Sequence, residues 1–145
     1  MQVVTPPDLV AAIQSETVHI PASTITRVSS ELSGEYRRGA HSRRALKTTE
    51  HRSAYLAARM PATYAACLAT MNQLKRVSRD FTIQSVLDIG GGSGASTWAA
   101  AEAFTSVKHI SVVESDLEMA KIGQRLASQS QHEAVRRASW MMGDV

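Results

Sequence analysis

Cysteine is almost absent from this sequence, and aromatic residues and long apolar runs are scarce as well. Cys67 is the single cysteine among 145 residues, which excludes an internal disulfide framework and a metal site built from several cysteines. Aromatic residues make up 5%, and no apolar run approaches the roughly 18 residues that span a bilayer. The first residues also lack the basic stretch and apolar core of a secretory signal. These absences predict a protein of the cytoplasm or a matrix compartment, with no membrane span and no metal.

Positive charge is present and is unevenly distributed. The net charge is +3, yet residues 37–59 hold seven basic residues and one acid, Glu50. A concentrated positive segment attracts polyanions through Coulomb forces and counterion release, although a solvated basic face would look the same. The candidates for nucleic-acid contact are Arg37, Arg38, Arg43, Arg44, Lys47, Arg52 and Arg59.

Residues 1–80 carry a helical pattern. Ile25, Val28 and Leu32 recur at helical spacing after Pro21, and a second apolar stripe follows Pro61. β-branched alternation, the pattern of a half-buried strand, does not occur before residue 82. We therefore predict an all-helical N-terminal region over residues 1–80 that includes the basic segment 37–59.

Residues 81–145 have a different sequence pattern, in which short apolar segments typical of strands alternate with segments typical of helices. The expected strands are 85–89, 109–114 and about 140–142. Ser115, followed three residues later by Glu118, has the spacing of a capping box and is expected to cap the helix after the second strand. Strand–helix alternation predicts an α/β fold: the first half of a doubly wound, Rossmann-like parallel sheet with right-handed connections.

The first strand leads directly into the glycine-rich turn Gly90-Gly91-Gly92-Ser93-Gly94. Such a turn brings the backbone close to a ligand and aims helix N–H groups at it. The spacing Gly90-x-Gly92-x-x-Ala95 fits the dinucleotide fingerprint. Asp88-x-Gly90-x-Gly92-x-Gly94 also fits the first motif of class I S-adenosylmethionine-dependent methyltransferases. A carboxylate repels a pyrophosphate but attracts the positive sulfonium and amino groups of S-adenosylmethionine. Asp88 therefore favours the methyl donor over a dinucleotide.

Two further acids stand at strand ends. Glu114 closes the second strand, where a carboxylate accepts hydrogen bonds from ribose hydroxyls, and Asp144 follows the third strand, where an acid lies near the adenine amino group. Asp88 could instead cap the helix, and Glu114 could be a solvated strand end. No general base is identified. The predicted cofactor-binding residues are Asp88, Gly90, Gly92, Gly94, Glu114 and Asp144.

Two blocks carry a resemblance to a known family. Residues 52–66, which include Tyr55-Leu56-Ala57-Ala58-Arg59-Met60-Pro61-Ala62, and residues 85–94 resemble the methyltransferase-like proteins of the small ribosomal subunit, known in mitochondria and with bacterial relatives. The resemblance implies a class I methyltransferase fold that associates with small-subunit rRNA, in the bacterial cytoplasm or the mitochondrial matrix. Mitochondrial members also carry a cysteine-based metal cluster, which the lone Cys67 does not match.

The number of strands limits what this chain is expected to do. A class I fold has about seven strands around its switch point, and this sequence supplies three. We therefore expect the N-terminal portion of an S-adenosylmethionine-dependent methyltransferase acting on rRNA, inactive by itself and prone to self-association through its open first strand. A non-catalytic ribosome assembly factor with the same fold is the alternative, and a fragment of an NAD-binding oxidoreductase is a third.

Overall fold

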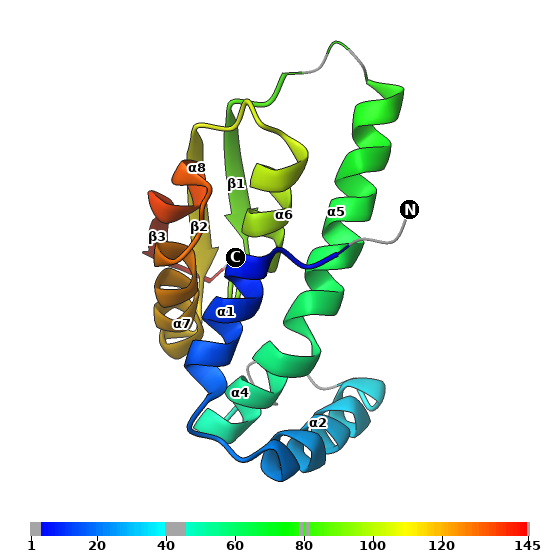
Figure 1. Ribbon diagram of the computed structural model, residues 1–145, viewed down its shortest axis with the longest axis vertical. Helices are drawn as coiled ribbons and strands as arrows, with labels where there is room; N and C mark the ends of the chain where they lie inside the picture. Colours follow the sequence, from blue (N-terminus) through cyan, green and yellow to red (C-terminus); the bar gives the residue numbers. More distant parts are fainter. Residues whose placement is uncertain (1–3, 40–45, 79, 81, 145) are drawn as a thin grey trace.

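The computed structural model describes residues 4–39, 46–78, 80 and 82–144, without the side chain of Tyr36, and it begins with helices. The helices that precede the sheet in these ranges are α1 (Pro7–Thr17), α2 (Ala22–Arg37), α4 (Thr49–Ala58) and α5 (Met60–Val77). Helix α2 packs on α4, and the long helix α5 runs beside α6 of the following region (Figure 1). None of the helices in the described ranges is both long and apolar enough to cross a membrane.

Local signals explain where α4 and α5 begin. Thr48 caps α4, because its Oγ1 accepts a hydrogen bond of 3.2 Å from the His51 amide. Helix α4 ends at Ala58, and α5 starts at Met60 with Pro61 in its first turn. A proline there costs no hydrogen bond, since the first amides of a helix have no partner within it. The break between the two helices thus falls at Arg59, and Pro61 lies within the first turn of α5.

Three parallel strands form one sheet in the order β1-β2-β3. The elements are β1 (Ser85–Ile89), α6 (Ala95–Ala103), β2 (His109–Glu114), α7 (Leu117–Ser128), α8 (Glu133–Arg136) and β3 (Ser139–Met142). Figure 1 shows the strands side by side, with α6, α7 and α8 as their connections. The predicted α/β class, with helices first and a partial Rossmann-like sheet second, is confirmed.

The cap of α7 differs from the prediction. Asp116, not Ser115, is the N-cap residue: its Oδ1 accepts hydrogen bonds from the amides of Glu118 at 2.9 Å and Met119 at 3.2 Å. The Ser115 amide donates instead to Glu114 Oε1 at 2.8 Å. Because the Asp116 side chain reaches the amides of Glu118 and Met119, the helix starts one residue later than the capping-box spacing suggests.

One hydrophobic core joins the helical region to the sheet. It runs from Leu9 and Tyr64 in the first helices to Trp98 in α6, Val112 in β2 and Leu126 in α7, each almost fully buried. The alanines of α6 allow α5 to approach closely, as expected for helices that meet through small side chains. The N-terminal helices are therefore part of the fold that supports the glycine turn.

The indole of Trp140 joins three elements. A Cβ built on Gly94 would lie 3.4 Å from Trp140 Cη2, and a Cβ built on Gly123 in α7 would overlap the same ring. Trp140 itself belongs to β3. The absence of side chains at Gly94 and Gly123 thus lets one ring of β3 pack against both α7 and the end of the glycine turn.

The other face of the sheet is apolar and exposed. Side chains alternate across a strand, so Val112 points toward the helices while Leu87 and Ile89 point away, with 60% and 55% of their surface exposed. Ile89 pairs in register with Val113, and Val113 with Met141, which is 48% exposed. Within the described residues β1 pairs only with β2, so its outer edge is open.

Candidate functional site

The glycine turn joins β1 to α6 in a backbone shape that requires glycine. Gly90, Gly92 and Gly94 have φ angles of 71°, 57° and 90°, a region that side-chain-bearing residues rarely adopt. A Cβ on Gly91 would overlap the Val112 side chain. Gly94 then serves as the N-cap of α6. The turn therefore places the positive end of a helix at the carboxyl edge of the sheet.

Glu114 is bonded to this turn. Its Oε2 accepts a hydrogen bond of 2.6 Å from the Gly92 amide, and its Oε1 accepts from the amides of Ser115 and Asp116, both at 2.8 Å. Glu114 is 9% exposed, and three backbone donors balance its buried charge. The carboxylate thus holds the glycine turn against the loop that follows β2.

Asp88 lies under the first turn of α6. Its Oδ2 accepts hydrogen bonds from Ser96 Oγ at 2.6 Å and from Thr97 Oγ1 at 2.8 Å. Gly94 has no side chain with which to cap α6, so Asp88 supplies the negative charge that the start of a helix favours. The structure thus gives Asp88 a structural role that the sequence left open beside cofactor binding.

The residues around the turn enclose a cavity of about 160 Å³. It is lined by Leu46, Tyr55, Thr63, Gly90, Gly91, Gly92, Ala95, Ser96, Glu114, Asp116 and Met119. Of these, Gly90, Gly92 and Glu114 were predicted from the sequence, whereas the predicted Asp88 and Gly94 do not line the cavity. Tyr55 on α4 and Thr63 on α5 were not predicted, although both lie in the block that carries the family resemblance. Asp144 follows β3, is exposed, and does not line this cavity.

The predicted nucleic-acid contacts that the structure describes differ in exposure. Arg52 forms an ion pair of 3.6 Å with Asp116, and both side chains are only 17% exposed. It therefore links α4 to the loop after β2. Arg37, Arg38 and Lys47 are exposed.

Three of the predicted basic residues remain: Arg59, Arg43 and Arg44. Arg59 is half-buried and has an interaction of its own. The predicted positions Arg43 and Arg44 lie outside the described residues. Of the predicted basic residues that the structure describes, the exposed ones are thus at the end of α2 and just before α4.

Cys67 lies on α5 and packs partly against the core, as predicted for a small core residue. Burial raises the pKa of its thiol, and the charge of Asp88 raises it further. The thiol is therefore mostly protonated at neutral pH and a weak nucleophile.

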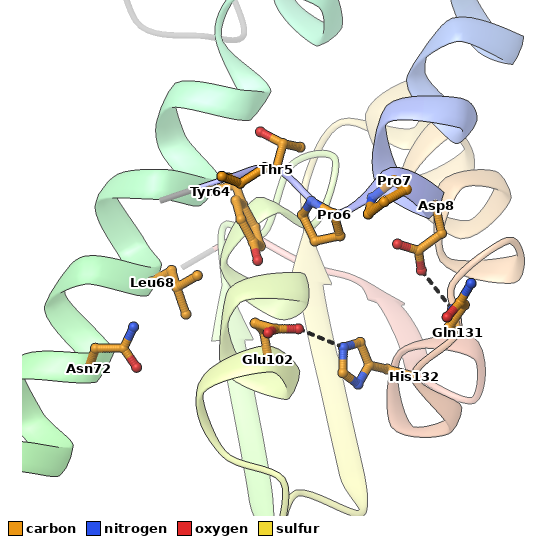
Figure 2. Close-up of a pocket in the computed structure, with 11 residues that line it drawn as sticks. Thr5, Pro6, Pro7, Asp8, Tyr64, Leu68, Asn72, Glu102, Gln131 and His132 are labelled. Carbon is orange, nitrogen blue, oxygen red and sulfur yellow. Dashed lines mark hydrogen bonds and ion pairs between the residues drawn. The ribbon is translucent and has the colours of Figure 1, made fainter. Parts of the chain in front are cut away.

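A larger cavity, of about 610 Å³, lies away from the glycine turn between α1, α5, α6 and the start of α8 (Figure 2). Figure 2 shows the Glu102–His132 pair, joined at 3.0 Å, beside the ring of Tyr64. Burial, then the charges of Glu102 and Asp8, raises the pKa of Tyr64 to about 12. None of the predicted site residues lines this cavity.

Metal ligands do not gather in the part of the chain that the structure describes: no group there brings together three or more His, Cys, Asp or Glu side chains suited to a metal ion.

A parallel strand, a glycine turn and a helix, with acids at the ends of β1 and β2, define a partial Rossmann-like fold. The family described as mitochondrial small ribosomal subunit Rsm22 matches residues 49–144. The chain belongs to this family, and the resemblance drawn from residues 52–66 and 85–94 is confirmed. No curated protein matches the chain significantly.

Solved methyltransferase structures are similar to this chain at low identity. A protein described as a caffeoyl-CoA O-methyltransferase from Staphylococcus aureus has a TM-score of 0.47 and 17% identity, over 80% of this chain and 50% of its own. The mitomycin 7-O-methyltransferase MmcR has a TM-score of 0.47 and 19% identity, over 99% and 42%. Coclaurine N-methyltransferase, bound to N-methylheliamine and SAH, has a TM-score of 0.42 and 14% identity, over 96% and 50%. The chain thus spans about half the length of these proteins or less.

Proposed function

We propose that this chain binds S-adenosylmethionine at the glycine turn, as the first half of a methyltransferase-like protein of the small ribosomal subunit. The observation that carries the proposal is the turn itself, held by Glu114 and opening at the N-terminus of α6. Membership of the Rsm22 family supports the ribosomal setting. The corresponding compartment is the bacterial cytoplasm or the mitochondrial matrix, wherever the partner ribosome resides.

The backbone of the glycine turn leaves room for a ligand to approach. A Cβ built on Gly90 meets no atom within 4 Å, so the turn is open above that residue. Pockets for ligands of this size usually measure about 300–1,000 Å³, and the cavity here measures about 160 Å³. The described residues therefore supply one wall of the site, and we propose that the remainder of a complete sheet supplies the other.

Each candidate residue has a proposed role. Gly90, Gly92 and Gly94 form the floor, and Asp88 faces the amino end of the cofactor. A carboxylate oxygen accepts along two lone-pair directions. Glu114 Oε1 accepts hydrogen bonds from two backbone amides, and Oε2 accepts one. Because Oε2 thus keeps one lone-pair direction for a further donor, it is the proposed acceptor for a ribose hydroxyl. We place Asp144 near the adenine, at the end of β3.

The proposed chemistry rests on positioning. The cofactor, when bound, supplies an electrophilic methyl group, and the protein aligns it with an acceptor. No residue of this chain is assigned as a general base. We expect the isolated chain to bind S-adenosylhomocysteine weakly and to transfer no methyl group to rRNA.

Calorimetric titration tests the cofactor proposal. S-adenosylhomocysteine should bind to the 145-residue chain and should not be displaced by NAD, and Asp88→Asn should weaken binding. If NAD displaces it, the oxidoreductase alternative is correct. A folded chain that binds neither compound would refute the cofactor site.

A second candidate is a ribosome assembly factor that keeps the fold without catalysis. It is favoured by the hydrogen bonds of Asp88 and Glu114, which stabilise α6 and the turn and so give both acids a structural role. Asp88→Asn in the complete protein discriminates the two, because it keeps a side-chain oxygen for Ser96 and Thr97 and removes only the charge: retained ribosome association and normal growth favour the scaffold, whereas normal association with loss of function favours the enzyme.

We also propose that the two regions of the chain have different binding roles. Residues 1–80 contact the rRNA of the small subunit through the exposed Arg37, Arg38 and Lys47, and residues 81–145 hold the cofactor. Basic side chains on phosphates position a nucleic acid without reading its sequence, which is sufficient for a protein that recognises an assembled ribosomal particle.

A further inference from the structure

A polar groove of about 480 Å³ lies between α2 and α4, on the helical region and apart from the glycine turn. Its lining residues are Ile25, Thr26, Ser29, Ser30, Ser33, Arg37, Ala57 and Ala58. Of these described residues, four bear a hydroxyl, one bears a guanidinium, and none bears a carboxylate. The small alanines of α4 leave room for a ligand between the helices.

The hydroxyl groups of the groove differ in the hydrogen bonds that they already make. Thr26 Oγ1 donates to the Ala22 carbonyl at 3.0 Å, and Ser30 Oγ donates to the Thr26 carbonyl at 3.2 Å. Because a hydroxyl has one proton and two lone pairs, these two present acceptors to the groove. Ser29 Oγ is buried and has no hydrogen-bond partner among the described residues, so its hydrogen-bonding capacity is unused.

Charge distinguishes this groove from its neighbour on the other flank of α2. That neighbour, of about 400 Å³, is lined by Glu31 and Glu35 together with Arg38 and His51, and its carboxylates repel an anion. Among the described residues that line the α2–α4 groove, Arg37 is the only charged one. An anionic ligand is therefore favoured on one side of α2 only.

We propose that the α2–α4 groove binds a ribose–phosphate unit of RNA. The Arg37 guanidinium matches a phosphate, and the acceptor lone pairs of Thr26 and Ser30 match a 2′-hydroxyl, the group that distinguishes RNA from DNA. This inference rests on the proposed association with rRNA and adds the place and the chemistry of one contact.

The chain offers a matched pair of variants for the test. Thr26 and Thr70 are both exposed, both lie inside long helices, and both donate to the carbonyl four residues earlier. Thr26 lines the groove, and Thr70, on α5, does not. Thr26→Glu and Thr70→Glu thus make the same chemical change in and out of the site.

The assay is fluorescence anisotropy of the whole chain with a short mixed-sequence RNA oligonucleotide and with DNA of the same sequence. Wild type should bind RNA more tightly than DNA. Thr26→Glu should weaken RNA binding about tenfold, and Thr70→Glu about twofold at most, because only the first places a carboxylate beside the phosphate. Arg37→Gln, at an exposed position, should lower the slope of log K against log salt by about one.

The outcomes separate this proposal from the function it rests on. If wild type binds RNA but the two glutamate variants weaken it equally and Arg37→Gln leaves the salt slope unchanged, the groove is refuted while RNA association stands. Equal affinity for DNA refutes the 2′-hydroxyl contact. If wild type binds no RNA at low salt, both proposals fail. Circular dichroism verifies folding, and Arg37→Gln decides the matter if Thr26→Glu unfolds.

Discussion

Replacing Glu114 with glutamine tests whether its carboxylate holds the glycine turn. Three backbone amides donate to Glu114, one to Oε2 and two to Oε1, at 2.6–2.8 Å. Glutamine keeps the shape but has a single oxygen. Whichever way it points, its NH₂ group must face at least one amide donor, and the negative charge is lost.

The magnitude follows from the number and kind of bonds. A hydrogen bond to a charged group contributes about 1.5–3 kcal/mol, and the variant loses at least one and weakens the rest. We expect the free energy of unfolding to fall by about 2–4 kcal/mol. For a chain of this size each kcal/mol lowers the melting temperature by about 2–4 °C, so the shift should be about 4–16 °C.

Thermal unfolding followed by circular dichroism at pH 7 measures this shift. Glu118→Gln is the matched control, because Glu118 is exposed and pairs with Lys121 at 2.9 Å, an interaction of a kind that contributes under about 1 kcal/mol. If both variants melt within about 2 °C of each other, Glu114 does not hold the turn.

Three further predictions follow from packing and burial. Gly123→Ala should lower the free energy of unfolding by about 1–3 kcal/mol, since its methyl group would overlap the indole ring. Gly34→Ala in α2 should leave that free energy unchanged or raise it. Equal urea midpoints for the two variants would contradict this prediction. Leu87→Lys should reduce association of the isolated chain in sedimentation velocity, and Leu117→Lys, equally exposed on a helix, should not; if both act alike, the open strand is not the contact. Burial raises the pKa of Cys67, so iodoacetamide should alkylate it more slowly at pH 8 than a free cysteine peptide, with a rate midpoint at higher pH; a rate equal to the peptide's would refute the shift.

The sheet and its turn were predictable because their signals are local. A short apolar run followed by closely spaced glycines allows few backbone shapes, and the φ angles of Gly90, Gly92 and Gly94 are those that the spacing requires. The helix break just before Pro61 likewise depends on one residue and its neighbours. In each case the sequence neighbours alone determine the conformation.

The walls of the site were not predictable, because they depend on contacts between distant segments. Arg52 looks like any other cation of a basic segment, yet it pairs with Asp116, a partner that only the packing of α4 against the sheet reveals. Tyr55 and Thr63 reach the turn for the same reason. The cap of α7 is likewise one residue later than the spacing indicated, because the Asp116 side chain reaches the amides of Glu118 and Met119.

The contact of Trp140 with Gly94 and Gly123 has a consequence for the order of folding. The turn and α6 are synthesised well before β3, so a nascent chain that ends in α7 has the glycines but not the ring that packs against them. Pairing of β3 with β2 is a long-range step with a substantial loop-closure cost. The cofactor-side turn should therefore acquire its final rigidity late, when the strand that carries Trp140 has left the ribosome and docked.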